Sequence, residues 1–119
     1  MENDIAPIVL TGLLKPGTNF DDLAWERFRE GVDIHRIYGT QDAGASAALL
    51  RYRPGASLPY HVHTAHEHIL VLSGSQHDGW REGRAGTVTI YPPGSGHAIV
   101  SAAGCVALAI WHGPVRFPE

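Results

Sequence analysis

Residues 55–74 read Gly55-Ala-Ser-Leu-Pro-Tyr-His61-Val-His63-Thr-Ala-His-Glu67-His-Ile-Leu-Val-Leu-Ser-Gly74. Successive side chains of a β-strand point to opposite faces, so His61, His63 and Glu67 would share one face if the segment stayed extended. Imidazole nitrogens with one carboxylate oxygen suit divalent iron, manganese, nickel, copper or zinc better than calcium or magnesium, which prefer oxygen ligands. The stretch therefore predicts three ligands of a metal site.

A second stretch supplies a fourth candidate ligand. It reads Gly86-Thr-Val-Thr-Ile-Tyr-Pro92-Pro-Gly94-Ser-Gly-His97, and its prolines and glycines predict a sharp turn just before the histidine. Three imidazoles and one carboxylate leave a divalent ion with one net positive charge and, if it prefers six ligands, two adjacent open positions. We predict one divalent metal ion per chain, either iron, manganese or zinc with nickel or copper as further candidates, held by His61, His63, Glu67 and His97.

Both stretches resemble the two motifs of the cupin superfamily. The first matches in its histidines, glutamate and flanking glycines, and the second matches apart from Ser101, which stands where an asparagine is usual. The resemblance covers residues 45–112. It implies an all-β cupin fold, the double-stranded β-helix or antiparallel jelly-roll barrel, of about six to eight strands. We expect one cupin domain over residues 1–119, with an N-terminal arm at 1–24 and a barrel core at 45–112.

Within that superfamily the chain resembles the ChrR-type anti-sigma-factor cupin-like domain. Shared blocks are His-x-His-x-x-x-Glu, Ile-Leu-Val-Leu-Ser-Gly, Tyr-Pro-Pro-Gly-Ser-x-His and Ser101-x-x-Gly104-Cys105. His68 departs from this group, which has a second acidic residue directly after the liganding glutamate. The group's anti-sigma action belongs to a separate N-terminal helical region, for which the sequence before Trp25 leaves no room. We therefore expect a stand-alone module rather than a complete anti-sigma factor.

Length and charge narrow the class of protein. A chain of 119 residues can bury one core, and a formal charge of −3 without a basic run gives no indication of a nucleic-acid partner. No segment is long enough to span a membrane, and the opening Met-Glu-Asn-Asp lacks the positive charge of a signal peptide. The single cysteine, Cys105, excludes an internal disulfide and fits a reducing compartment. We expect a cytoplasmic protein.

Short β-type runs alternate with Gly/Pro turns along the chain. They predict strands over residues 47–53, 67–72, 87–91, 98–100 and 105–111. Residues 21–28 predict a brief helical turn capped by aspartate. The nearly continuous apolar run 106–111 predicts a strand covered on both sides, which together with the resemblance favours a homodimer.

The other histidines and the larger polar side chains receive ordinary interpretations. His66 and His68 are even-numbered, whereas His61, His63 and Glu67 are odd-numbered, so on a strand they would point to the opposite face. We therefore expect them outside the barrel or at its mouth, where they could still orient the ligands. The histidines outside both motifs are His35, His77 and His112. Aromatic and arginine side chains on strands more often pack in the core or face solvent than line a pocket. The side chains of these types that could line a pocket are Tyr38, Arg51, Arg53, Tyr60, Tyr91 and Trp111.

Three functional hypotheses stay open. Open positions on iron or manganese could hold an enolate oxygen pair and dioxygen, which predicts a dioxygenase for a small enolisable or aromatic ketone. The resemblance agrees, because related cupins include carbon–carbon-cleaving dioxygenases of diketones, although some of them use three histidines without a carboxylate. Alternatively, the four ligands close a tetrahedral zinc shell, giving a non-catalytic ChrR-like sensor or interaction module. Isomerase or hydrolase chemistry fits the same ligands.

Overall fold

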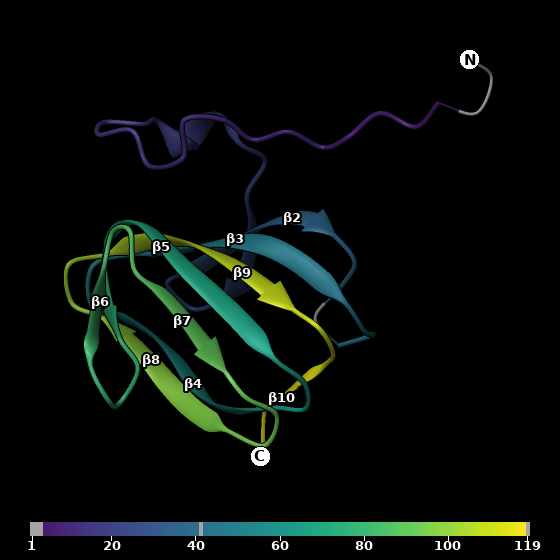
Figure 1. Ribbon diagram of the computed structural model, residues 1–119. Helices are drawn as coiled ribbons and strands as arrows, with labels where there is room; N and C mark the ends of the chain where they lie inside the picture. The colour runs from purple at the N-terminus through teal and green to yellow at the C-terminus, as the bar shows by residue number, and fades with distance from the viewer. Residues whose placement is uncertain (1–3, 41, 119) are drawn as a thin grey trace.

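The computed structural model describes residues 4–40 and 42–118, and their regular secondary structure is almost entirely β (Figure 1). A single short 3-10 helix among them, η1 (Phe20–Asp22), precedes the strands. The strands are β1 (Glu26–Arg29), β2 (Val32–Tyr38), β3 (Ser46–Tyr52), β4 (Ala56–His63), β5 (Glu67–His77), β6 (Glu82–Arg84), β7 (Val88–Tyr91), β8 (Gly96–Ser101), β9 (Cys105–Trp111) and β10 (Val115–Arg116).

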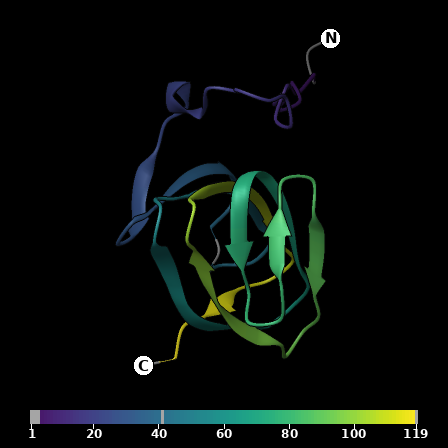
Figure 2. The ribbon, with the colours of Figure 1, turned by 90° about the vertical axis from the view of Figure 1, so that its left-hand side faces the viewer.

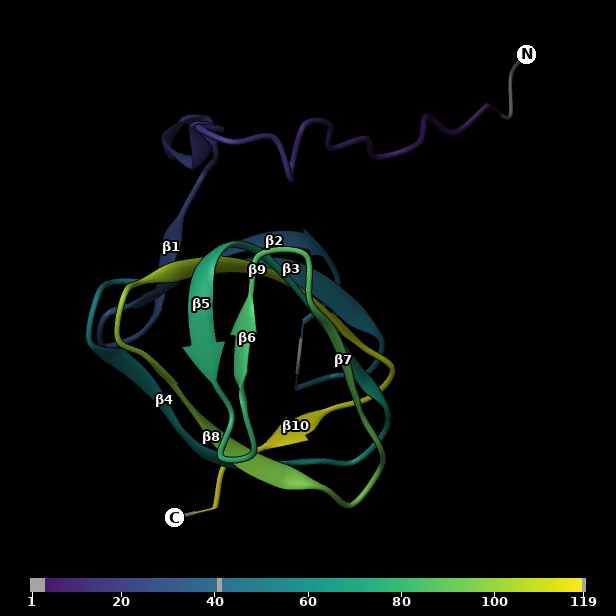
Figure 3. The ribbon, with the colours of Figure 1, turned by 60° about the vertical axis from the view of Figure 1, so that its left-hand side comes forward.

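All strand pairs are antiparallel, and the sheet curls around one interior (Figures 2 and 3). The strand order is β1-β2-β3-β9-β5-β8-β4-β10, with β6 and β7 also paired to β5. Strand β5 connects the two sides of the barrel, because its first residues pair with β9 and β7 and its last residues pair with β6 and β8. The antiparallel all-β barrel expected from the sequence is confirmed.

The expected strands are all present, but five others were not expected. Strand β9 has the expected bounds, and β3, β5, β7 and β8 overlap the predicted runs. The unexpected strands are β1, β2, β4, β6 and β10. Strand β2 shows why: only Val32 and Ile34 are fully buried, and the polar residues between and after them gave no strong β signal. The sheet therefore begins before residue 45 and continues past residue 112.

The prediction of a helical turn at 21–28 is wrong in its length and in its capping residue. It covers only Phe20–Asp22, and the side chain of Asn19, not an aspartate, accepts a hydrogen bond from the Asp21 N–H at 2.9 Å. Residues 26–29 instead form β1, in which Glu26 pairs with Ile34 of β2. Pairing with a neighbouring strand satisfies more backbone groups than one further helical turn would, so tertiary structure overrides the local signal.

The outer face of β9 is covered in part by the chain's own N-terminal segment, which lies above the barrel in Figure 1. Val106 of β9 is 5% exposed and packs with Leu49 and Leu72 in a cluster outside the barrel. The residues that cover this cluster are Leu10, Leu13, Phe20, Leu23 and Trp25. The chain itself therefore buries Val106, but Leu108 and Ile110 on the same outer face are only partly buried, and a homodimer stays a prediction.

The main core fills the barrel interior. It includes Ile34, Leu50, Ile69, Val71 and Ala109, each no more than 6% exposed. Polar residues that are also buried inside the barrel are therefore conspicuous, since such groups need partners. No helix in the part of the chain that the structure describes is long and apolar enough to cross a membrane.

Candidate metal centre

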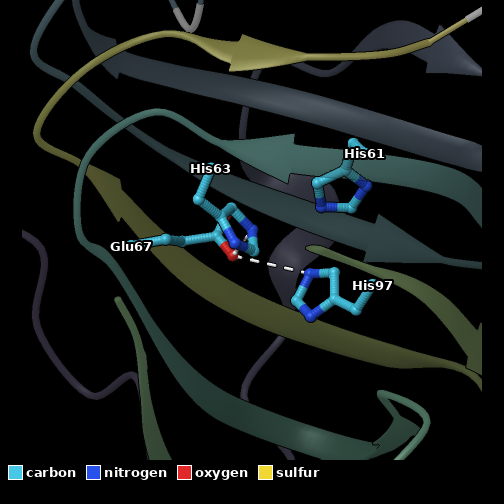
Figure 4. Close-up of side chains that lie close together, drawn as sticks. All are labelled: His61, His63, Glu67 and His97. Carbon is cyan, nitrogen blue, oxygen red and sulfur yellow. Dashed lines mark ion pairs between the residues drawn. The ribbon is translucent and has the colours of Figure 1, made fainter. Parts of the chain in front are cut away.

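Three strands bring the four predicted ligands together inside the barrel (Figure 4). Strand β4 carries His61 and His63, β8 carries His97, and β5 begins at Glu67. His61 and His97 are direct partners in the β4–β8 register. The chain bends between His63 and Glu67. The assumption that residues 61–67 form one extended segment, with all three side chains on one face, is therefore wrong. Glu67 reaches the site because the barrel curves, not because it shares a strand with the histidines.

The four side chains are buried and close. Their exposed fractions are between 1% and 4%, and one ligand atom from each lies within 4.8 Å of the others. Oε1 of Glu67 is 2.8 Å from Nε2 of His63 and 3.6 Å from Nε2 of His97. The His63 nitrogen and the Glu67 oxygen nevertheless make no hydrogen bond and are left buried without a partner. A divalent cation would satisfy both atoms, so this donor set fits a metal ion and could bind one.

Two of the histidines are held in the tautomer that a metal ligand requires. The Nδ1 of His61 lies 2.9 Å from the carbonyl oxygen of Pro59, which can only accept, so Nδ1 carries the proton. The Nδ1 of His63 lies 3.0 Å from Oγ of Ser95, whose own hydroxyl donates to the Pro92 carbonyl at 2.6 Å. The serine oxygen therefore accepts from Nδ1–H, and both Nε2 atoms keep their lone pairs.

Glu67 is oriented by Trp111. The two residues are direct partners in the β5–β9 register, and the indole Nε1–H donates to Oε2 of Glu67. This bond occupies one carboxylate oxygen and leaves Oε1 facing the histidines. The sequence indicated Trp111 only as one of several residues that could line a pocket. Its role depends on a contact between residues 44 positions apart, which no local pattern shows.

A second aromatic residue, Tyr91, fixes the imidazole rings. Its ring stacks on His63 at a centroid distance of 5.2 Å and meets His97 edge-on at 4.2 Å. Its hydroxyl donates to Oδ2 of Asp78 at 2.6 Å. Burial raises the pKa of Asp78, but hydrogen bonds from Tyr91 and from the N–H groups of Trp80 and Arg81 outweigh it and hold that pKa below its usual value. Sequence reasoning missed Asp78, because nothing near it resembles a motif.

Burial also controls the charge of the histidines. It lowers the pKa of His97 to about 4, against the opposing effect of the Glu67 carboxylate. It likewise lowers the pKa of His61. Both imidazoles are therefore neutral near pH 7, which is the form that binds a metal ion.

A small pocket adjoins the ligand set. Three of the four ligands, His61, Glu67 and His97, form part of its wall. The apolar walls include Phe28, Leu50, Leu58, Ile99, Val115 and Phe117. The cavity volume is about 20 Å³, and a water molecule needs roughly 10–15 Å³ of such volume, so the pocket has room for one or two waters.

The pocket is covered by the C-terminal tail. The Phe117 ring lies 5.1 Å from His61 and 6.3 Å from Phe28, measured between ring centroids. The guanidinium of Arg29 lies 4.3 Å from the centre of the Phe117 ring, on its face. Strand β10 anchors this tail by pairing Val115 with His63. The tail therefore forms a cover over the pocket that is joined directly to the strand carrying two ligands.

Most of the other residues indicated by the sequence lie away from the candidate ligands. His66 is exposed and His68 is half-buried, as expected from their parity. Among the pocket candidates, Trp111 lines the pocket and Tyr91 contacts the ligand rings. The candidates that lie outside this pocket are Tyr38, Arg51, Arg53 and Tyr60. Arg51 instead bonds Asp21 and Asp33 on the outer side of the sheet.

Comparison with known proteins identifies relatives of this fold. The family model of the ChrR cupin-like domain matches residues 16–116. The structure of Rhodobacter sphaeroides SigE in complex with the anti-sigma ChrR contains a similar chain, 27% identical with a TM-score of 0.69, over 78% of this chain and 50% of that one. No match was found among curated protein sequences.

Two further structures are similar in fold. A protein with a cupin-like fold from Ralstonia eutropha JMP134 is 23% identical with a TM-score of 0.66, over 75% of this chain and 60% of that one. An acetylacetone dioxygenase from Acinetobacter johnsonii is 14% identical with a TM-score of 0.75, over 98% of this chain and 85% of that one. This chain thus spans only 50–60% of the length of the ChrR and Ralstonia proteins.

The family match extends over most of the chain and includes every candidate ligand. The barrel topology and the cupin-fold relatives agree with it. The chain therefore belongs to the ChrR cupin-like domain family.

Proposed function

We propose that this protein is a metal-dependent enzyme of the dioxygenase type that acts on a small enolisable or aromatic ketone. In this proposal one iron or manganese ion is held by His61, His63, Glu67 and His97. The observation that carries the proposal is the pocket, because three of the four ligands line it. A purely structural metal site needs no adjoining cavity, whereas a catalytic site keeps an open position that faces one.

The ion would supply Lewis acidity and, as ferrous iron, electrons for dioxygen. The chain's own residues supply binding and exclusion of water. The apolar wall, which includes Leu50, Leu58 and Ile99, excludes bulk water and fits the hydrocarbon part of a small ketone. The carboxylate of Glu67 stays oriented through Trp111, and His61 and His97 stay neutral because burial lowers their pKa values.

Two polar side chains on the pocket wall could orient a ketone or enol oxygen. Burial raises the pKa of Tyr52 well above its usual value, so its hydroxyl keeps its proton and can donate a hydrogen bond. Gln76 accepts a weak hydrogen bond from the Cys105 thiol at 3.6 Å through its amide oxygen. Its amide nitrogen is thereby left as a donor on the pocket wall.

The size of the cavity sets a condition on this proposal. A ketone of several heavy atoms exceeds a cavity of about 20 Å³, so a cover must move before such a substrate enters. Phe117 is the candidate, because it lies in the C-terminal tail beyond β10 and packs directly on His61. The acetylacetone dioxygenase from Acinetobacter johnsonii has the same fold, which supports the capacity of this architecture for such chemistry.

The test begins with the metal. Untagged protein, purified without chelator or a nickel column, is analysed for its elements, and about one iron or manganese per chain is expected. Iron-loaded protein is then supplied with acetylacetone and with hydroxylated acetophenones while dissolved oxygen is monitored. The matched control is Glu67→Gln, which keeps the side-chain volume and removes the charge. Absence of oxygen consumption with every small diketone and phenolic ketone would contradict the enzyme proposal.

A second candidate function is a metal-dependent interaction module. The family match and the ChrR complex with SigE favour it, and so does the small size of the cavity. In this proposal zinc closes the ligand set, and metal binding shapes a surface for a protein partner. Stoichiometric zinc with a stable partner in a pull-down, and no turnover, would support it. Measurable turnover without a stable partner would exclude it. Under either candidate we propose a cytoplasmic homodimer.

A further inference from the structure

Three histidines outside the metal centre meet on the outer side of the barrel. His66 directly precedes β5, His68 lies in β5, and His112 directly follows β9. The ring centroids of His68 and His112 are 5.0 Å apart, and those of His66 and His112 are 6.1 Å apart. We call His66, His68 and His112 the outer histidine cluster. No sequence pattern connects His112 with the other two, which lie more than 40 positions away.

The outer histidine cluster resembles the metal centre in how its backbone segments pair, although His66 and His112 lie just beyond the ends of β5 and β9. In the centre, a His-x-His pair on β4 faces His97, which is the direct partner of His61 on the neighbouring antiparallel strand. In the outer histidine cluster, a His-x-His pair faces His112, whose N–H donates to the carbonyl oxygen of His66 at 3.0 Å. Alternate residues of a strand share a face, so each arrangement directs three imidazoles to one side of one strand pair.

The ring separations agree with shared coordination. In the metal centre the three imidazole centroids lie 4.6–5.2 Å apart. His68 and His112 already fall in this range. His66 is farther from His112, at 6.1 Å, and its side chain is exposed. Nδ1 of His68 is buried and has no hydrogen-bond partner, so the outer histidine cluster holds an unsatisfied ligand atom.

The backbone beneath the outer histidine cluster is firmly connected. Besides the bond between His112 and His66, the Thr64 N–H donates to the Pro114 carbonyl at 3.3 Å. The β5–β9 ladder continues from there with Glu67 opposite Trp111 and His68 opposite Ile110. This frame fixes the positions from which the three side chains project, which lowers the entropy cost of binding a ligand between them.

We propose that the outer histidine cluster is a second metal site, which binds a late first-row divalent cation such as zinc, copper or nickel. Imidazole ligands favour these ions over calcium and magnesium, which prefer oxygen. Two of the three ligands are exposed, so the site is more open than the metal centre and keeps at least one coordination position for water or another ligand. Glu67 lies between His66 and His68 and points to the opposite face, so the two sites share one strand.

The test measures zinc bound per chain, with zinc itself as the probe. Metal-free wild-type protein is dialysed against a series of free zinc concentrations and analysed for its elements. We expect two equivalents, the second with a weaker affinity than the first. The double variant His66→Ala/His112→Ala should bind one equivalent, with the stronger affinity unchanged. The variant His97→Ala should lose the stronger equivalent and keep the weaker one. The matched control His77→Ala removes an exposed histidine outside both sites and should still bind two.

A second measurement keeps the result independent of any variant's folding. Histidine ring nitrogens of isotope-labelled wild-type protein are followed by NMR during the titration, and the second zinc equivalent should shift His66, His68 and His112. One equivalent in the wild type would overturn the proposal. So would a second equivalent that persists in the His66→Ala/His112→Ala double variant, or that shifts only other histidines. Because the readout is metal content, failure here leaves the proposed oxygenase function untouched.

Discussion

Trp111 donates its indole N–H to Glu67 across the β5–β9 strand pair, inside the barrel. The contact joins the largest side chain of β9 to the one carboxylate of the metal centre. It fixes which carboxylate oxygen faces the histidines. The apolar strand β9 is therefore more than a core strand, because its last residue orients a ligand.

We expect Trp111→Phe to weaken metal binding by about 10-fold or more, because partners that orient a metal ligand contribute on the order of 10–100-fold to affinity. Affinity is measured by competition with a chelator of known strength. Trp80→Phe is the matched control, since Trp80 is 68% exposed and does not contact the ligands. Equal affinities for the two variants would contradict the orienting role of Trp111.

Replacement of a ligand should have a larger effect. His61→Ala or His97→Ala should remove most metal from the buried site, since the three ligands left cannot keep the same coordination geometry. Metal content after purification is compared with that of wild type and of His77→Ala. Unchanged metal content in the two ligand variants would show that the ion is held elsewhere.

Loss of the cover over the pocket should speed exchange with solvent. Phe117→Ala removes the ring that packs on His61, so we expect faster release of the bound ion to a chelator. The neighbouring residue provides the control, because Arg116 is exposed and lies outside the pocket. If Phe117→Ala and Arg116→Ala release the ion at the same rate, the tail does not close the pocket.

The metal-free protein should lose stability as the pH falls from about 6.5 to about 4. The unfolded chain binds a proton at His97 near the usual value of 6.5, whereas burial lowers the pKa in the folded state to about 4. Between these values the unfolded state holds more protons, so protonation favours unfolding. His61 acts in the same direction. Urea midpoints at several pH values measure the slope, and His97→Gln should make it shallower. An unchanged slope would exclude His97 as the cause.

The N-terminal segment should contribute directly to stability. Trp25 packs over the outer cluster of Leu49, Leu72 and Val106, and its indole N–H donates to the Phe20 carbonyl at 2.7 Å. Trp25→Ala should lower the free energy of unfolding by about 1–3 kcal/mol, measured by urea denaturation. Leu14→Ala, at a residue 53% exposed in the same segment, should change it little. Similar losses for both variants would mean that the segment does not act by covering this cluster.

The sequence by itself determined which residues are candidate metal ligands and the class of fold. The candidate ligands lie in two short sequence motifs, in which Gly and Pro turns separate β-type runs. Both ends of strand β9 could be predicted to the correct residue, because its apolar run is continuous and ends at clear turns. Strands β2 and β4 could not, because alternating or polar-rich segments become strands only when a neighbour pairs with them.

Only the tertiary structure decided what surrounds each ligand. Ser95 meets His63 across 32 positions and Trp111 meets Glu67 across 44, and neither contact has a local signature. The same holds for the outer histidine cluster, which forms because β5 and β9 are neighbours in the sheet. Local patterns fix which atoms are available for coordination, whereas long-range strand pairing fixes which of them meet. The free energy of those contacts depends on burial, which exists only once the barrel has closed.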